Sequence, residues 1–396
     1  MHPIERKEYL DRLISLKDKN FIKILSGIRR SGKSTLLEMF KEHLLKTGIS
    51  TSNIAHINMD SWDVKKNITN KDKLYDHIKK SLGDGRNYIL IDEIQNISEW
   101  EDVMIAVYTD MDADIYITGS NALMLSSDLS TKLVGRYIEI HVLPLSFKEF
   151  NEFLKGTNKE EMFNRYLRIG GFPGVVLVPE ERNRQDAVKG IYHTIMNSDV
   201  IMKNNIKDPA LIERLAEYLM GNIGNITSVK NISDYLNSSG TKTTPATIDN
   251  YVMMLERSYL IYKAKRYDIR GKRVLKTFDK YYVTDLGLRN MVTAHTDMGY
   301  SLENVIYFEL LRRGYQVYVG TIDQTEVDFI AVRGSDTTYY QVCTTVMDEN
   351  VRERELRPFK KIRDHHSKTL LTLDQIIADN YDGVKCINIL DFLLDD

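Results

Sequence analysis

The sequence of 396 residues has little of what marks secreted, disulfide-rich or membrane-spanning proteins. Its two cysteines, Cys343 and Cys386, are too few for a disulfide framework and lack the spacing of a metal site. No uninterrupted apolar run approaches the roughly 20 residues that span a bilayer, and the first residues are charged, without an apolar signal core. We therefore expect a cytoplasmic protein that does not bind membranes.

An excess of charge of one sign is also missing, because 54 basic residues face 56 acidic residues and the formal net charge is −2. A chain with this balance is no polycation, so any contact with nucleic acid must come from a local patch. The hydrophobic content of 42% is typical of folded globular domains. At this length we expect about two to four domains.

The first 150 residues alternate short apolar runs with spacers of helix length. The runs lie at residues 21–25, 54–57, 88–91, 115–118 and 137–140. Strands separated by helices favour a parallel sheet that is covered on both faces. The sequence therefore predicts an α/β fold with a five-stranded parallel sheet.

Residues 27–34, Gly-Ile-Arg-Arg-Ser-Gly-Lys-Ser, fit the phosphate-binding pattern GxxxxGK[ST] between a predicted strand and a predicted helix. Gly27 and Gly32 let the backbone curl so that its N–H groups point at phosphate oxygens. Lys33 would contact the β- and γ-phosphates, and Ser34 would give its hydroxyl to Mg²⁺. We expect ATP and Mg²⁺ as ligands, and the expected nucleotide contacts are Gly27, Ile28, Arg29, Arg30, Ser31, Gly32, Lys33, Ser34 and Thr35.

Two later strand ends carry polar groups that suit ATP hydrolysis. Asp92 would hold Mg²⁺ and Glu93 would polarise the attacking water, although a single carboxylate at a strand end is often merely solvated. Asn121 would contact the γ-phosphate or the water, or would instead cap the next helix. Arg136 would reach a γ-phosphate in its own subunit or in a neighbour, or would form a structural ion pair. The neighbouring-subunit role would require a homo-oligomer.

Several segments together resemble a prokaryotic AAA-type ATPase family whose members carry a C-terminal domain of unknown function. The segments are Asp92-Glu93-Ile94-Gln95, Thr118-Gly119-Ser120-Asn121-Ala122, Gly135-Arg136, Pro144-Leu145-Ser146-Phe147 and Gly170-Gly171-Phe172-Pro173. The resemblance covers most of the chain. It implies a five-stranded ATPase core, a helical lid, a winged-helix segment and a C-terminal fold similar to restriction-type nucleases.

Residues 229–257 are typical of a helix-turn-helix, with a first helix at 229–237 and a second that begins at Thr244-Pro245. Predicted strands at 259–267 and 273–283 would form a wing. Seven basic residues and one acid between 261 and 276 give a local charge of +6, which favours phosphate contact. The alternative is a packing or protein-binding module. The expected DNA contacts are Lys263, Lys265, Arg266, Arg270, Lys272 and Arg273.

The C-terminal segment has the order of a PD-(D/E)xK nuclease, with a helix at 302–313 and strands at 326–330 and 338–343. Glu303 and Asp328 match the pattern of that family. Gln341 stands where Glu is expected and Cys343 where Lys is expected, which weakens metal binding and removes the ammonium group. We therefore expect a nuclease-like fold without nuclease activity.

These patterns predict four domains and one leading function. The domains are an ATPase core at 1–145, a helical lid at 146–220, a winged helix-turn-helix at 221–295 and a nuclease-like α/β domain at 296–396, with a solvated acidic tail at 391–396. The leading hypothesis is an ATPase whose nucleotide state controls a DNA-binding C-terminal half. The alternatives are a nucleotide-dependent switch or scaffold for a protein partner and, less favoured, an ATP-regulated nuclease.

Overall fold

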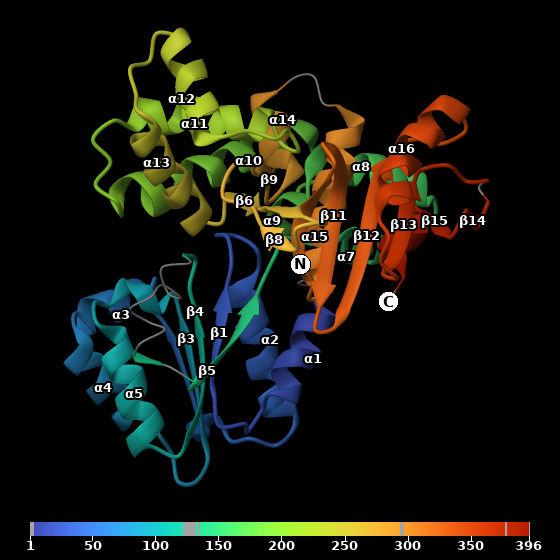
Figure 1. The fold of residues 1–396 in the computed structure, drawn as a ribbon. Coiled ribbons are helices and arrows are strands. Elements are labelled where there is room, and N and C mark those ends of the chain that lie inside the picture. Colours follow the sequence, from blue (N-terminus) through green and yellow to red (C-terminus); the bar gives the residue numbers. More distant parts are fainter. Residues whose placement is uncertain (1–3, 122–131, 134, 294–296, 377, 396) are drawn as a thin grey trace. The chain divides into compact units, whose positions relative to one another are not determined.

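The computed structural model describes residues 4–121, 132–133, 135–293, 297–376 and 378–395 (Figure 1). The chain divides into two compact units. The first comprises Met1–Pro144 with Arg257–Tyr259, and the second comprises Leu145–Glu256 with Leu260–Asp396. No helix among the described residues combines the length and the apolar character that a membrane crossing requires.

The first unit is built on a five-stranded sheet in the order β2-β3-β4-β1-β5, and every neighbouring pair is parallel. The strands are β1 (Ile22–Ser26), β2 (Ile54–Asn58), β3 (Asn87–Asp92), β4 (Ala113–Thr118) and β5 (Tyr137–His141). All five predicted runs are strands of this sheet, so the predicted α/β fold with a five-stranded parallel sheet is confirmed.

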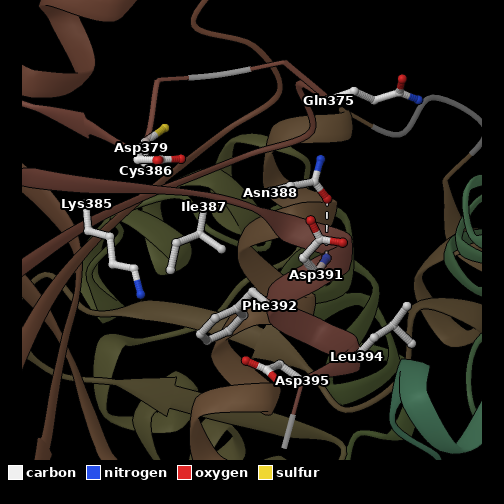
Figure 2. A pocket seen from close by; sticks show the side chains of 10 residues that line it. All are labelled: Gln375, Asp379, Lys385, Cys386, Ile387, Asn388, Asp391, Phe392, Leu394 and Asp395. Carbon is white, nitrogen blue, oxygen red and sulfur yellow. Dashed lines mark hydrogen bonds between the residues drawn. The ribbon is translucent and has the colours of Figure 1, made fainter.

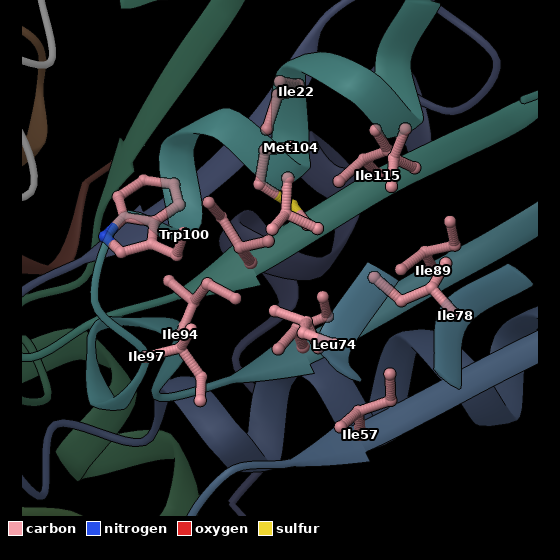
Figure 3. Packing of buried hydrophobic residues seen from close by; sticks show 14 of the residues in the cluster. Ile22, Ile57, Leu74, Ile78, Ile89, Ile94, Ile97, Trp100, Met104 and Ile115 are labelled. Carbon is pink, nitrogen blue, oxygen red and sulfur yellow. The ribbon is translucent and has the colours of Figure 1, made fainter. Parts of the chain in front are cut away.

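Helices cover both faces of this sheet (Figure 1). They are α1 (Lys7–Ser15), α2 (Lys33–Lys46), α3 (Trp62–Asn67), α4 (Lys71–Lys80) and α5 (Trp100–Asp110), with short 3-10 turns η1 (Thr51–Asn53) and η2 (Ile94–Asn96). Successive strand residues point to opposite faces, so Ile89 packs in the cluster shared with α4 and α5, and Leu90 packs in the cluster shared with α1 and α2. Figure 3 shows the first cluster, with Trp100 and Met104 of α5 over the sheet.

The second unit begins with helices. They are α7 (Phe147–Leu154), α8 (Lys159–Ile169), α9 (Pro173–Val176), α10 (Glu181–Thr194), the π-helical η4 (Ile195–Met202), α11 (Pro209–Gly221), α12 (Val229–Ser238) and α13 (Pro245–Arg257). Thr244 Oγ accepts a hydrogen bond from the backbone N–H of Thr247 at 3.2 Å, so the predicted cap of the second helix is present.

The rest of the second unit is a mixed sheet with helices on it. Its strands and helices are β6 (Ile261–Ala264), β7 (Arg266–Asp268), β8 (Arg273–Val274), β9 (Lys280–Val283), α14 (Leu286–Val292), α15 (Met298–Arg312), β10 (Gln316–Ile322), β11 (Thr325–Arg333), β12 (Asp336–Cys343), α16 (Glu349–Lys361), β13 (Ser367–Thr372), β14 (Asn380–Tyr381), β15 (Val384–Asn388) and α17 (Ile389–Leu394). Eight of the strands form one sheet in the order β14-β15-β13-β12-β11-β10-β7-β8.

The predicted hairpin is present, since its two arms pair with each other in antiparallel fashion, but each arm is broken into two short strands. The two expected long strands are four short ones, because β6 pairs with β9 in a separate two-stranded sheet while β7 pairs with β8. β7 also pairs in parallel with β10 of the large sheet. The outer part of the basic hairpin, β7 with β8, is therefore tied into the C-terminal sheet, while β6 and β9 form a two-stranded sheet of their own.

The expectation of a solvated acidic tail was wrong for the described residues. Residues 389–394 form α17, and Ile389, Leu390, Phe392 and Leu393 are buried. The apolar residues lie on one face of a short helix, which a count of acidic residues does not reveal. A pocket of about 710 Å³ lies beside this helix. Figure 2 shows Asp391 and Asp395 among the residues that line it.

Candidate nucleotide-binding site and C-terminal site

The predicted phosphate loop connects the carboxyl end of β1 to the first residue of α2. Gly32 is the N-cap of α2 and has a φ of 100°, in the left-handed region. Gly27 has a φ of 137°, and a Cβ built on it would lie 2.2 Å from the carbonyl oxygen of Val142. Both the conformation and the close approach of Val142, the residue directly after β5, therefore require glycine at position 27.

The loop has two buried side chains, Ser31 and Lys33, followed by two exposed ones, Ser34 and Thr35. Lys33 is buried, and its Nζ donates hydrogen bonds to the carbonyl oxygens of Gly27 and Ile28, each at 2.9 Å. Ser31 Oγ is buried and has no hydrogen-bond partner among the described residues. Ser34 and Thr35 are exposed on the first turn of α2, where backbone N–H groups and the helix dipole favour an anion.

The two arginines of the loop lie toward solvent. Arg29 is half-buried and Arg30 is exposed, with a left-handed φ of 69°. Neither side chain is buried as that of Lys33 is. A peripheral role at the phosphates agrees with these positions.

Arg6 supports the loop, a role that no motif in the sequence indicates. Its guanidinium is buried, and Nη1 donates to the carbonyl oxygens of Ser31 at 2.9 Å and Leu143 at 2.7 Å. Nη2 lies 3.4 Å from the carbonyl oxygen of Pro144, and the ring of Tyr9 lies 4.5 Å below the guanidinium carbon. One arginine from the start of the chain thus fastens the phosphate loop to the segment after β5.

The carboxylates at the end of β3 meet the polar residues at the end of β4. Asp92 is buried and accepts a hydrogen bond from Thr118 Oγ. Glu93 has a left-handed φ of 54°, and its backbone N–H donates to the same hydroxyl at 3.0 Å. Its carboxylate accepts hydrogen bonds from Ser120 Oγ at 3.2 Å and from the amide of Gln95. The predicted Mg²⁺ ligand and the predicted water-activating residue therefore lie side by side.

Asn121 and Arg136 have very different positions. Asn121 is buried directly after Ser120 at the carboxyl edge of the sheet, and Ala122 of the same motif lies outside the described residues. Arg136 is exposed before β5, and its carbonyl oxygen accepts from the N–H of Ile22 at the start of β1. The phosphate loop leaves the other end of β1, about 15 Å away at the usual rise per residue. Contact between Arg136 and a γ-phosphate in its own subunit is incompatible with that separation.

The basic hairpin has acidic partners close to it. Lys263 Nζ lies 3.4 Å from the carboxylate of Glu256, Arg270 lies 2.7 Å from Asp323, and Arg273 lies 3.9 Å from Asp268. Arg266 donates to Thr321 Oγ at 3.3 Å, within the contact between β7 and β10. Lys265, Lys272 and Lys276 are exposed and form no ion pair within 4.0 Å in the part of the chain that the structure describes.

The two carboxylates that match the nuclease pattern, Glu303 and Asp328, lie near a buried lysine that no sequence motif includes. Lys280 of β9 is buried, and its Nζ lies 2.8 Å from the carboxylate of Glu303 and 2.6 Å from that of Glu326. Burial opposes the charge of Lys280, but these carboxylates and Asp328 raise its pKa above the ordinary value. Burial in turn raises the pKa of Glu303 and that of Asp328.

Gln341 and Cys343 do not face this cluster as a nuclease pair would. Gln341 Oε1 accepts from the backbone N–H of Asp328 at 2.8 Å, and its Nε2 donates to Glu355 at 3.1 Å. Cys343 belongs to the apolar cluster under α16, and burial raises the pKa of its thiol to about 12. Among the described residues, no three His, Cys, Asp or Glu side chains are arranged to hold a metal ion.

A second residue missed from the sequence is Asp285, the N-cap of α14. Its carboxylate accepts from the N–H groups of Gly171 at 2.6 Å and Gly287 at 2.8 Å. A Cβ on Gly170 would lie 1.9 Å from this carboxylate. Burial raises the pKa of Asp285 to about 6. The Gly-Gly-Phe-Pro segment is therefore a binding loop for a structural aspartate.

The parallel sheet, the phosphate loop and the two carboxylates after β3 define the fold of an AAA-type P-loop ATPase. Residues 19–151 match the family described as AAA domain, and residues 160–298 match a domain of unknown function (DUF8612). The chain belongs to the family of proteins that join these two domains.

Relatives and a solved structure agree with this assignment. An uncharacterized protein of Haemophilus influenzae is 38% identical over 99% of this chain and 98% of its own length. An uncharacterized protein of Methanocaldococcus jannaschii is 28% identical over 98% of this chain and 89% of its own length. The structure of a Walker-type ATPase of Pyrococcus abyssi aligns with 73% of this chain and 95% of its own, with a TM-score of 0.54 and 16% identity, and is similar in fold.

Proposed function

We propose that this protein binds and hydrolyses ATP in a magnesium-dependent reaction. The observation that carries the proposal is the convergence at one sheet edge of the phosphate loop after β1, the carboxylates after β3 and the polar residues after β4. The three strands are neighbours and parallel, so their carboxyl ends lie together. This edge is where open α/β sheets bind their ligands.

The residues present fit a magnesium ion. Ser34 offers an exposed hydroxyl, and Asp92 offers a carboxylate of which one oxygen is already fixed by Thr118. Oxygen donors of this kind suit Mg²⁺, which binds through few protein ligands and substrate phosphates. When bound, the ion would neutralise charge on the β- and γ-phosphates.

The chain's own residues would then do the following. The N–H groups at the start of α2 and the ammonium of Lys33 would bind the phosphates, and the hydroxyl of Ser31 would gain a partner that the described residues do not supply. Glu93 would accept the proton of the water that attacks the γ-phosphorus. Asn121 would orient that water or contact the γ-phosphate.

The binding half of the proposal is tested by Lys33→Ala, with Lys46→Ala as a matched control. Lys46 lies exposed at the other end of α2. Titration with a fluorescent ATP analogue in Mg²⁺ should show saturable binding to the wild type and to Lys46→Ala. Affinity should fall at least about 100-fold for Lys33→Ala, in line with the loss of a charge-assisted phosphate contact. Equal affinity of all three proteins would refute the site.

We further propose that the C-terminal half, with helix-turn-helix α12–α13 and the basic hairpin, binds DNA under the control of the nucleotide. What supports it is the helix order, the Thr244 cap and the lysines at 265, 272 and 276. Phosphate contacts of this kind lose affinity steeply with salt.

The test of DNA binding should replace the exposed lysines and leave the paired residues intact. Exchange of Lys265, Lys272 and Lys276 for Glu should lower duplex affinity and reduce the slope of log affinity against log salt by about 0.9 per lost phosphate contact. An unchanged slope would refute this surface. ATP turnover unaffected by DNA would favour the alternative of a switch that binds a protein partner.

We also propose that the C-terminal domain does not cleave DNA. The ammonium of Lys280 already occupies the space beside the carboxylates of Glu303 and Glu326 as their ion-pair partner, and Cys343 is buried in an apolar cluster. Incubation of plasmid DNA with the protein and Mg²⁺ or Mn²⁺ should give no cleavage. Cleavage that disappears in Asp328→Ala would contradict the proposal.

Oligomerisation is proposed on one further ground. Arg136 is exposed and far from the phosphate loop of its own subunit, as an arginine that acts on a neighbouring subunit must be. Light scattering with ATP and magnesium should show a mass above 45.9 kDa, the mass of one chain. A monomer at all nucleotide concentrations would refute this role for Arg136.

A further inference from the structure

Three residues at the end of α13, Arg257–Tyr259, belong to the ATPase unit, whereas the residues before and after them belong to the second unit. Of the residues from 145 onward, Arg257–Tyr259 are grouped with Met1–Pro144, whereas Glu256 and Leu260 are grouped with the second unit. Arg257 is also the last residue of α13. The second helix of the helix-turn-helix is therefore continuous with a segment of the ATPase unit.

Tyr259 is the aromatic residue of this stretch. Its side chain is buried, and its ring lies 4.8 Å from the imidazole ring of His141 at an interplanar angle of 48°. Its φ of 59° is left-handed, a conformation that is uncommon for a bulky residue and that persists only where the surroundings hold it. Burial raises the pKa of its hydroxyl, so the ring stays neutral.

His141 is joined to the residue before the phosphate loop. Its Nδ1 lies 2.9 Å from Ser26 Oγ, and the same hydroxyl is hydrogen-bonded to Glu139. Ser26 is fully buried, and its carbonyl oxygen accepts from the N–H of Val142 at 2.8 Å. The end of β1 and the end of β5 are thus fixed to each other on both sides of His141.

The phosphate loop packs against the backbone of Val142 at Gly27. Gly27 follows Ser26 directly, and the space that a Cβ would need is taken by the carbonyl oxygen of Val142. Close-packed elements of this kind transmit displacements because they cannot deform continuously. The backbone at Gly27 is therefore packed tightly against that of Val142, the residue after His141.

We propose that Tyr259 couples the nucleotide site to α13: a phosphate group in the loop moves the β1–β5 junction, and the contact of His141 with Tyr259 passes this movement to the end of α13. The left-handed backbone of Tyr259 is the two-state element, because it is held by its packing and relaxes when His141 withdraws. The inference rests on the proposed nucleotide binding and concerns its regulatory output. It assigns Tyr259 no part in hydrolysis.

The test is hydrogen exchange of the α13 amides in the full-length protein, with and without a non-hydrolysable ATP analogue and Mg²⁺. In the wild type we expect the analogue to change exchange rates in α13 at least about 5-fold, the lower end of ordinary coupling between sites. In Tyr259→Leu the change should fall below about 2-fold, while analogue affinity stays within about 2-fold of the wild type.

Two further variants separate coupling from damage to the fold. Tyr262→Leu removes a ring three residues later that packs on Phe308 in the second unit, and it should keep the full response. His141→Leu approaches the same contact from the ATPase unit and should lose the response. The double variant with Tyr259→Leu should be no worse than either single one, because residues that act through one contact are not additive.

The outcomes distinguish this inference from the proposed function. A wild type that binds the analogue but shows no change in α13, or a Tyr259→Leu protein that keeps the full change, would overturn the coupling and leave nucleotide binding intact. A wild type that fails to bind the analogue in a direct titration would overturn both. A response lost equally in Tyr262→Leu would show a general loosening of the segment and would also overturn the assignment to Tyr259.

Discussion

Replacement of Arg6 by alanine should weaken both the fold of the ATPase unit and the nucleotide site. Two hydrogen bonds from the buried guanidinium, at 2.7 and 2.9 Å, end on carbonyl oxygens that lose their partner in Arg6→Ala. Hydrogen bonds from charged groups contribute about 1.5–3 kcal/mol each, and burial of the guanidinium offsets part of this. We expect the free energy of unfolding to fall by about 2–4 kcal/mol.

The effect should extend to the nucleotide, because one of those carbonyl oxygens belongs to Ser31 in the phosphate loop. Arg12→Ala is the matched control, since Arg12 is exposed on α1 and donates to a single carbonyl oxygen, that of Glu139, at 3.1 Å. The measurements are urea denaturation and titration with an ATP analogue. We expect a loss of stability and at least about 10-fold weaker binding for Arg6→Ala, with less than about 1 kcal/mol of unfolding free energy lost for Arg12→Ala. Identical behaviour of the two variants would refute the role assigned to Arg6.

Two further predictions concern close packing and buried charge. Gly27→Ala should abolish binding of ATP analogues and lower the thermal midpoint, because a Cβ cannot fit 2.2 Å from the carbonyl oxygen of Val142; normal binding in a fluorescence titration would contradict this. Lys280→Met should lower the unfolding free energy at pH 7.5 by about 3–5 kcal/mol, because it leaves the carboxylates of Glu303 and Asp328 buried without their cation. Carboxyl groups with a raised pKa bind more protons in the folded than in the unfolded state, so part of this loss should be recovered between pH 7.5 and pH 5; a loss that is equal at both pH values in denaturant titrations would argue against charge burial.

The sheet of the ATPase unit could be predicted because its information is local. Each strand is a short and mostly apolar run, which is the pattern expected of a parallel sheet that helices cover on both faces. The phosphate loop could be predicted for the same reason, since its glycines, lysine and serine are consecutive. The register that brings Asp92 beside Thr118 follows once the strands are neighbours.

What the sequence did not reveal depends on residues far apart in the chain. Arg6 lies 137 residues from Leu143, and Asp285 lies 114 residues from Gly171. No periodicity marks such a partner. Lys280 belongs to no sequence motif. Its carboxylate partners lie on α15 and β11, and only the folded chain brings them to β9.

The errors have equally physical causes. The basic hairpin was expected as two long strands, but β7 gains a parallel partner in β10, and the chain bends between two sheets to reach it. The last residues were expected in solvent because they are acidic, yet the apolar residues between the aspartates pack as α17. Local charge was misleading where tertiary packing decided the outcome.

The most direct test of the central proposal is phosphate release from Mg²⁺-ATP by the wild type and by Glu93→Gln, compared at equal nucleotide occupancy. We expect measurable hydrolysis by the wild type and at least about 100-fold slower hydrolysis by Glu93→Gln, with nucleotide affinity within about 2-fold of the wild type. Hydrolysis at the wild-type rate in Glu93→Gln, or none by a wild type that binds ATP, would contradict it.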